Sequence, residues 1–226
     1  MRVHVAFTPD EAAAASTAIV IDVLRATSTI AQALSVGYDT VLCVPEIEQA
    51  RALRAEIPDS IVGGERDAIR IEGFDLGASP REFLEPRAET LILSTTNGTR
   101  TIVTAAERCE EVLIGSLLNL DAAVAVARER GEDVAILCAG YKGAFALDDA
   151  YCAGRFVALL GGEPTDAAAA AAVIARAYPD ARTGLNARTY GPPGLEEDIA
   201  FCARESVLDV VPRFAGMRGP AAEIAL

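Results

Sequence analysis

The chain has 226 residues, of which 51% are hydrophobic and 5% aromatic, and its formal net charge is −13 at pH 7. Such an acidic field repels nucleic acid and anionic lipid, so we expect neither a nucleic-acid partner nor a membrane partner. The length suits one large α/β domain or two small lobes that share an interface. Without Trp, the core must consist of Ala, Val, Leu and Ile, which suits helices packed on a parallel or mixed sheet.

The same composition indicates the cellular compartment and argues against some kinds of site. Residues 1–10 lack the apolar stretch of an export signal, and the alanine run at 167–172 is too short to cross a bilayer. Five cysteines without a CxxC pair are typical of reduced thiols, so we expect a cytoplasmic protein. The single histidine, His4, argues against a Cys/His zinc site and against a Ser-His-Asp triad.

The first half of the chain alternates short apolar runs with helical patterns. Strands are expected at 18–23, 40–44 and 60–62. A turn at 24–29 leads into a helix that ends near Val36, before Gly37, and Pro45 opens a second helix to about Ile57. Residues 67–89 are expected to be irregular.

The second half repeats this alternation up to Gly161. The expected strands lie at 90–93, 111–114 and 134–137, and the expected helices lie at 99–108, from the Asn119 cap to 130, and at 148–160. After Gly161 we expect an Ala-rich helix, a Gly/Pro break at 191–194 and a helix at 195–206, which together form a covering layer. The prediction is a single domain over 1–226 with a layered α/β/α fold and a largely parallel or mixed sheet. An alternative is two topologically similar lobes that meet at the active site.

Polar residues gather where the predicted strands end, and ligands of open α/β sheets bind at that edge. Small hydroxyl residues at helix N-termini suit an oxyanion, because free backbone N–H groups and the positive helix end attract phosphate. For any single Ser or Thr, helix capping is the better explanation, but several such turns at one edge favour a site. The candidates are Asp22, Arg25, Ser28, Glu65, Arg66, Thr95, Thr96, Asn97, Gly98, Ser116, Asn119, Asp148 and Asp149.

Carboxylates in this set are candidates for Mg²⁺, which prefers a few carboxylates completed by water and substrate oxygens. The competing explanation for Asp22 is a salt bridge to Arg25 within its own turn. For Asp148 and Asp149 it is the complement of an acidic first turn to the helix dipole. Cys138 is interpreted as a buried core residue, since no histidine is available beside it. Neither a P-loop nor a dinucleotide fingerprint is present.

An ordered set of sequence runs resembles the 2-phosphosulfolactate phosphatase family. The runs are VIDVLRATSTIAQAL (20–34), GGER (63–66), GFDLGASPREF (73–83), TTNGTR (95–100), GSLLN (115–119) and CAGYKGAFALDDAYCAG (138–154), with a weaker match in GLEEDIAFC (194–202). The resemblance implies an α/β fold with two related lobes and an acidic nucleophile. It also implies a Mg²⁺-dependent phosphatase that converts 2-phosphosulfolactate to sulfolactate and phosphate, a step towards coenzyme M.

By its place in these runs, Asp22 matches the family's acidic nucleophile. As a mechanistic hypothesis, Arg25 and Arg66 are catalytic residues that neutralise substrate charge, and Glu65 and Asp149 are the expected Mg²⁺ ligands. The alternative is direct attack by water, with Asp22 as base or metal ligand. Substrate contacts are expected from Ser28, Ser79, Thr95, Thr96, Asn97, Gly98, Ser116 and Asn119. Two positions depart from the family pattern: Ala78 stands where a GNSP run has Asn, and Asp148 stands where Glu is frequent. The Ala78 departure bears on the exact substrate more than on the type of reaction. The expected substrate is a small anionic phosphorylated acid.

Two alternatives stay open from the sequence. One is a phosphatase for a different small phosphorylated 2-hydroxy acid, which the Ala78 departure supports. The other is a non-catalytic small-anion binding protein on the same scaffold, which would need no metal. The apolar C-terminal region permits a homodimer.

Overall fold

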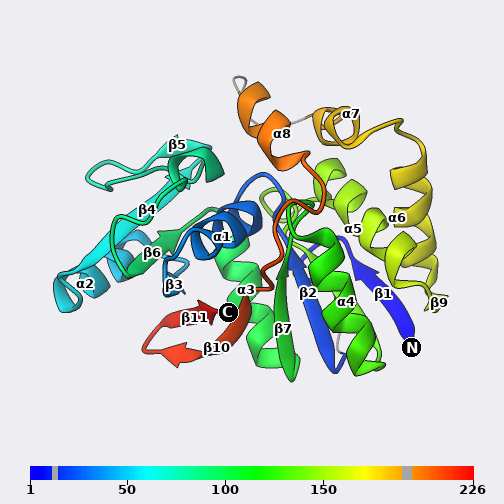
Figure 1. Cartoon of the computed structure of the whole chain (residues 1–226), viewed down its shortest axis with the longest axis horizontal. Helices are drawn as coiled ribbons and strands as arrows, with labels where there is room; N and C mark the ends of the chain where they lie inside the picture. The colour runs from blue at the N-terminus through cyan, green and yellow to red at the C-terminus, as the bar shows by residue number, and fades with distance from the viewer. Residues whose placement is uncertain (12–14, 190–194) are drawn as a thin grey trace.

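The computed structural model of the protein describes residues 1–11, 15–189 and 195–226. In these ranges eleven strands form a sheet in the order β5-β4-β6-β3-β11-β10-β7-β2-β8-β1-β9 (Figure 1). The strands are β1 Arg2–Ala6, β2 Thr17–Ile21, β3 Thr40–Cys43, β4 Ser60–Arg66, β5 Ile69–Arg70, β6 Thr90–Ser94, β7 Glu111–Gly115, β8 Val134–Cys138, β9 Glu163–Pro164, β10 Arg213–Arg218 and β11 Ala221–Ala225.

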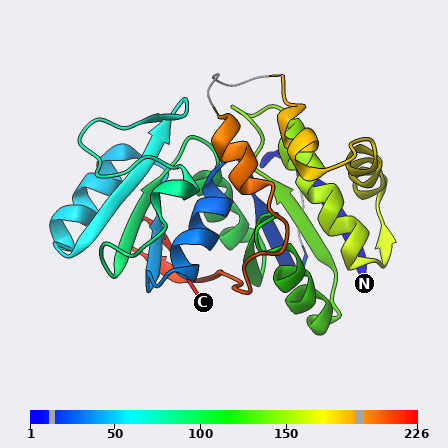
Figure 2. The same ribbon diagram turned by 45° about the horizontal axis from the view of Figure 1, so that its top comes forward.

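Helices cover both faces of this sheet, which confirms the layered α/β prediction (Figure 2). They are α1 Ala26–Ser35, α2 Ile47–Glu56, α3 Gly98–Arg108, α4 Leu120–Arg130, α5 Leu147–Leu160, α6 Asp166–Arg176, α7 Ala181–Asn186 and α8 Glu196–Cys202, with a 3₁₀ turn at Pro80–Glu82. None of the helices in the described ranges is long and apolar enough to cross a membrane.

Strand β2 shows how the two layers of core arise. All five of its residues are buried, and successive side chains point to opposite faces of the sheet. Ile19 and Ile21 pack with residues of α4, α5 and α6, whereas Ala18 and Val20 pack with residues of α1 and α3. A continuous apolar run is the pattern of a strand buried on both faces, and this is why β2 is readable from the sequence.

Parallel pairing brings the polar turns together within each of two groups of strands. β2 lies between β7 and β8 and pairs in parallel with both, and β6 pairs in parallel with β3 and β4. Ile21 is in register with Cys138, and Gly64 is in register with Ser94. The turns that follow β2 and β8 therefore leave their group of strands at a common edge, and so do the turns that follow β4 and β6. The antiparallel strands β10 and β11 lie between the two groups.

The last strands correct the prediction that everything after Gly161 forms a covering layer. β10 and β11 form an antiparallel hairpin that enters the middle of the sheet, where β11 pairs with β3 and β10 meets β7 (Figure 1). Gly216, Gly219 and the charged ends of β10 hide the alternating pattern of a strand, and the partners of the hairpin lie about 100 or more residues away in sequence. Helix α7 was also not predicted. The break expected at 191–194 lies outside the described residues.

Smaller differences concern element ends. Helix α2 begins at Ile47 rather than at Pro45, because Glu46 is the N-cap residue and forms a capping box with Gln49. The helix expected to reach 206 ends at Cys202. Cys138 is buried, as interpreted from the sequence, and burial raises the pKa of its thiol well above the usual value, which keeps it unreactive.

Candidate active site

A pocket with about 640 Å³ of empty space lies at the edge where the polar turns meet. Turns that are far apart in the sequence contribute to it, as an active site on an α/β sheet requires. The lining residues are Asp22, Leu24, Arg25, Ala26, Glu65, Asp67, Ala68, Ala78, Thr95, Thr96, Asn97, Gly140, Tyr141, Asp148, Asp149, Arg188 and Leu195.

Asp22 follows β2 directly and opens the turn into α1. Its Oδ1 accepts the N–H of Ala26 at 3.2 Å, and its own N–H donates to Thr27 Oγ1 at 3.1 Å. Asp22 is 8% exposed. The turn that it opens contains a cis peptide bond between Leu24 and Arg25. The salt bridge to Arg25 that would explain Asp22 without a function is not formed in the described structure, because Arg25 pairs with Asp198 instead.

The electrostatics of Asp22 set it apart from an ordinary surface carboxylate. Burial, followed by the negative charges of Glu65 and Asp148, raises its pKa from 3.8 to about 7. The hydrogen bond from Ala26 opposes this rise but does not cancel it. A carboxyl group with a perturbed pKa at the edge of a parallel sheet is a candidate for catalysis.

Glu65 stands at the end of β4 and links two turns of the pocket. Its Oε1 accepts the N–H of Thr96 at 2.8 Å, and its Oε2 accepts the N–H of Ala68 at 2.6 Å. Both Asp67 and Ala68 have positive φ angles, so the tight turn after β4 gains support from this bond. The position of Glu65 is therefore fixed by main-chain donors on two sides.

Asp149 ties the turn after β2 to the turn after β8. Its Oδ1 accepts the N–H of Val23 at 2.9 Å, and its Oδ2 accepts the N–H of Gly140 at 3.0 Å. Burial, with the charges of Asp148 and Asp22, holds the pKa of Asp149 well above its usual value. Asp148 and Asp149 do lie in the first turn of α5, but both are buried at the pocket, so the helix dipole alone does not explain them.

The turn after β6 packs closely against Asp22. A Cβ atom placed on Gly98 would lie 2.5 Å from Asp22 Oδ2 and 2.5 Å from the Cβ of Ala26. Asn97 Oδ1 accepts the N–H of Lys142 at 3.1 Å, and Thr95 Oγ1 accepts the N–H of Thr99 at 3.2 Å. Gly98 is required for this close approach and does not itself line the pocket.

The donor set of the pocket suits a hard divalent cation. In the ranges that the structure describes, no group of three or more His, Cys, Asp or Glu side chains could hold a metal ion. A metal here would take few protein ligands and complete its shell with water and substrate, as Mg²⁺ does. Each oxygen of Glu65 and Asp149 accepts one N–H bond, and a carboxylate oxygen has a second lone pair for a cation.

Comparison with known sequences decides the family. The sequence model of 2-phosphosulpholactate phosphatase matches residues 4–216. The chain belongs to the 2-phosphosulpholactate phosphatase family. A relative from Thermus thermophilus is 40% identical over 98% of this chain and 98% of its own length. Two further relatives also match over most of both chains: one from Symbiobacterium thermophilum is 39% identical over 91% of this chain and 94% of its own length, and one from Clostridium acetobutylicum is 37% identical over 88% and 89%. All three are named probable 2-phosphosulfolactate phosphatase.

The family resemblance expected from the sequence is thus confirmed, and the structure sorts its motif residues into two groups. Seven of the predicted site residues line the pocket: Asp22, Arg25, Glu65, Thr95, Thr96, Asn97 and Asp149. Six do not: Ser28, Arg66, Ser79, Gly98, Ser116 and Asn119.

Arg66 is the clearest case of a predicted residue that does not line the pocket. Its guanidinium donates to Pro45 O at 2.7 Å, Glu65 O at 2.8 Å and Ser94 Oγ at 3.0 Å. These bonds brace the ends of β4 and β6 against the start of α2. The arginine of the GGER motif therefore supports the strand ends, and the oxyanion role expected for it stays a prediction.

The predicted hydroxyl and amide contacts outside the pocket also have structural partners. Ser28 Oγ donates to Val23 O at 2.8 Å, and Ser79 Oγ donates to Asp198 Oδ1 at 2.5 Å. Asn119 Oδ1 accepts from Ser116 N and Oγ, while its amide nitrogen donates to Ile114 O and Val210 O. In the described structure these side chains therefore stabilise nearby segments through hydrogen bonds.

Several lining residues were not among the predicted site residues. Arg188 follows α7, an element that was itself not predicted, so no strand-end signal pointed to it. Tyr141 lies within the CAGYKG run of the family but was not singled out. Asp198 does not line the pocket, yet it pairs with Arg25, and the only signal for it was the weak GLEED match.

Proposed function

We propose that this chain is a Mg²⁺-dependent phosphatase that hydrolyses 2-phosphosulfolactate to sulfolactate and phosphate. The observation that carries the proposal is the buried Asp22, whose pKa is raised to about 7 at a pocket that also contains Glu65, Arg25 and the TTNG turn. Membership of the family, and relatives named for this substrate, support the choice of reaction.

Charge balance supports a role for two arginines and a cation in binding this substrate. The substrate has a phosphate, a carboxylate and a sulfonate on a small skeleton, and the pocket offers it Arg25 and Arg188. The carboxylates of Asp22, Glu65, Asp148 and Asp149 would repel it. Mg²⁺ held by Glu65 and Asp149 would offset this repulsion and withdraw charge from the phosphoryl oxygens.

Asp22 is the residue to act on phosphorus, in one of two ways. As nucleophile, a carboxylate oxygen bonds to phosphorus while the bond from phosphorus to the C2 oxygen breaks, and water then hydrolyses the aspartyl phosphate. As base, Asp22 takes a proton from a water that attacks phosphorus directly. In both cases the leaving C2 oxygen gains a proton. Two successive displacements at phosphorus retain the configuration of a chiral phosphoryl group, whereas one direct displacement by water inverts it. Retention in the released phosphate would therefore support the nucleophile, and inversion would support the base.

The decisive experiment measures phosphate release from 2-phosphosulfolactate with and without Mg²⁺ and with chelator. We expect turnover that depends on Mg²⁺ and that Asp22→Asn abolishes, whereas Asp59→Asn, at an exposed position before β4, retains it. Wild-type turnover by Asp22→Asn would end both mechanisms. Tight phosphate binding without any turnover would favour the non-catalytic anion-binding alternative.

A second candidate function is a phosphatase for another small phosphorylated 2-hydroxy acid. Ala78 lines the pocket where the family pattern has an amide, so one polar contact to the substrate is missing. A panel of phosphorylated 2-hydroxy acids, compared by kcat/KM, separates the candidates. If Ala78 relaxes the substrate choice, Ala78→Asn will raise the preference for 2-phosphosulfolactate over the unsulfonated acids.

A further inference from the structure

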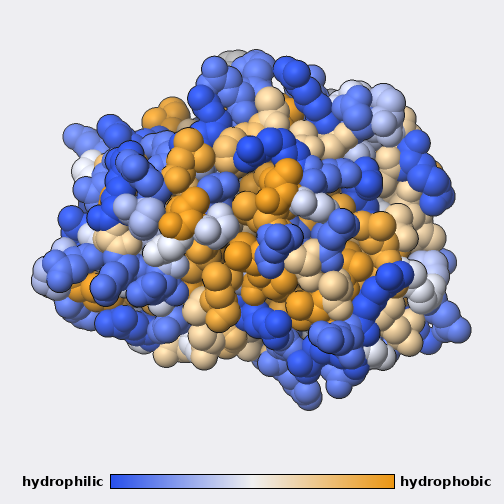
Figure 3. Space-filling view, in the orientation of Figure 1, coloured by the Kyte–Doolittle hydropathy of each residue, from blue (hydrophilic) through white to orange (hydrophobic). Residues whose placement is uncertain are grey.

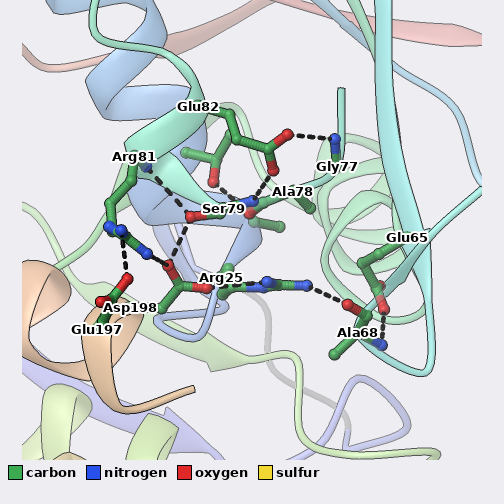
Figure 4. A network of polar contacts seen from close by, with 12 residues as sticks. Arg25, Glu65, Ala68, Gly77, Ala78, Ser79, Arg81, Glu82, Glu197 and Asp198 are labelled. Carbon is green, nitrogen blue, oxygen red and sulfur yellow. Dashed lines mark hydrogen bonds and ion pairs between the residues drawn. The ribbon is translucent and has the colours of Figure 1, made fainter. Parts of the chain in front are cut away.

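A buried ion pair joins the turn after β2 to helix α8. Arg25 Nη1 lies 2.9 Å from Asp198 Oδ2, and the two side chains are 9% and 7% exposed (Figure 4). The residues are 173 positions apart in sequence, and both α8 and α1 contact the 3₁₀ turn at Pro80–Glu82. Asp198 thus contacts a pocket residue from a helix that does not directly follow a strand of the sheet.

The second oxygen of Asp198 is also held. Ser79 Oγ donates to Asp198 Oδ1 at 2.5 Å, and Arg81 Nη1 lies 3.8 Å from the same oxygen (Figure 4). Ser79 begins the 3₁₀ turn, and its bond to Asp198 anchors that carboxylate in one orientation. The Ser-Pro motif therefore fixes Asp198, and through Asp198 it fixes Arg25.

The far side of the Arg25 guanidinium leads to the candidate metal ligand. Its Nη2 donates to Ala68 O at 3.1 Å, and Ala68 N donates to Glu65 Oε2 at 2.6 Å (Figure 4). A guanidinium has five N–H donors in a rigid plane, and these two bonds occupy two of them. The plane is held at both ends while Arg25 lines the pocket.

We propose that Asp198 is a positioning residue, which holds the Arg25 guanidinium in the orientation that binds the phosphoryl group. The expected effect of Asp198 on turnover rests on the proposed function, whereas its expected effect on phosphate binding does not. A buried ion pair is weak evidence for stability, since desolvation of both charges offsets their attraction. We therefore expect that removal of Asp198 acts mainly by releasing the orientation of Arg25 in the pocket.

Two variants on the same helix test the assignment. Asp198→Asn keeps the shape and an acceptor for Ser79 but removes the charge that holds Arg25. We expect it to lower kcat/KM about 10- to 100-fold, with a matching loss of affinity for inorganic phosphate by calorimetry. The control is Glu197→Gln, whose side chain is 75% exposed and pairs with Arg81 at the surface. We expect wild-type kinetics from the control.

A rescue experiment separates positioning from a merely structural role. In Arg25→Ala, added guanidinium should bind between Asp198 and Ala68 and restore at least tenfold of the lost kcat/KM. In Arg25→Ala combined with Asp198→Asn, guanidinium should restore nothing, and without guanidinium the double variant should be no less active than Arg25→Ala alone. Equal rescue of the single and double variants, or fully additive losses, would overturn the proposal.

The outcomes also separate this inference from the proposed function. If the wild type hydrolyses no 2-phosphosulfolactate but binds phosphate, the function fails. The phosphate affinities of the wild type, Asp198→Asn, Arg25→Ala and the double variant then still test Asp198. If Asp198→Asn is too unstable to purify, Ser79→Ala, which frees one oxygen of Asp198, should give a smaller loss of phosphate affinity in the same direction. A wild type that neither turns over substrate nor binds phosphate contradicts both.

Discussion

At the scale of single residues, Asp22 combines burial with negative neighbours, which is an unfavourable place for a charge. Without a cation, ionisation of Asp22 therefore lowers stability. The folded pKa of about 7 exceeds the ordinary value of 3.8, so the destabilisation is absent below about pH 4, grows between these values and is complete above pH 7.

Asp22→Asn should consequently raise the free energy of unfolding in the absence of divalent ions, by on the order of 1–3 kcal/mol at pH 8, while it abolishes turnover. Near pH 4 the two proteins should be about equally stable. Urea denaturation at both pH values measures the difference. Equal stability at pH 8 would show that Asp22 is not destabilised by its surroundings.

Gly98 provides a second prediction at this scale, because its missing side chain leaves room for Asp22 Oδ2. Gly98→Ala should displace Asp22 or α3, lower the free energy of unfolding by about 1–3 kcal/mol and reduce kcat at least tenfold. Steady-state kinetics with a thermal melt measures both effects. Glu107→Ala, at an exposed position of the same helix, serves as the control and should change neither. Full activity of Gly98→Ala would contradict the packing argument.

At the scale of elements, the strand ends are held by side chains as well as by the sheet. Arg66→Ala should leave Pro45 O and Ser94 Oγ without this donor and lower the free energy of unfolding by about 1–3 kcal/mol. Because Arg66 lies outside the pocket, KM for the substrate should change less than twofold where the variant is folded. Chemical denaturation and kinetics at low temperature measure the two quantities. A large rise in KM with unchanged stability would return Arg66 to the substrate-binding role.

The sequence alone predicts those elements whose patterns are local. The buried runs of β2 and β6 and the turns behind them are readable, and so is the meeting of Glu65 with the TTNG turn, because the parallel neighbours β4 and β6 end at the same edge. The meeting of these turns with Asp22 is not readable, because the antiparallel hairpin lies between the two groups of strands. Which strand-end side chains turn inward is not readable, since Arg66 and Asn119 differ from Arg25 only in tertiary contacts. The hairpin β10–β11 is defined by distant partners, and Asp198 becomes visible only once it pairs with Arg25 in the fold.

At the scale of the whole molecule, the hairpin β10–β11 joins two groups of parallel strands. β3, β4 and β6 lie on one side of it, and β1, β2, β7 and β8 lie on the other. Apolar side chains are visible around the centre of this face, over the region where the two groups meet (Figure 3). The hairpin thus covers two strand edges that would otherwise present unpaired backbone groups.

Removal of residues 213–226 should therefore expose β3 and β7 as edges and drive association. We expect the truncated chain to be mostly insoluble or to elute as large species in size-exclusion chromatography, whereas Met217→Thr, an exposed change within β10, stays like the wild type. A soluble truncated chain with wild-type melting behaviour would show that the two groups of strands hold together without the hairpin.

The order of the strands also has a consequence for how the protein is made. The chain visits one group of parallel strands, crosses to the other, and returns before the hairpin is synthesised. On the ribosome, every turn that lines the candidate pocket emerges before the two strands that close the sheet. Newly made chains therefore present two open strand edges until the last part of the sheet leaves the exit tunnel, and we expect any need for chaperones to be greatest at this late stage.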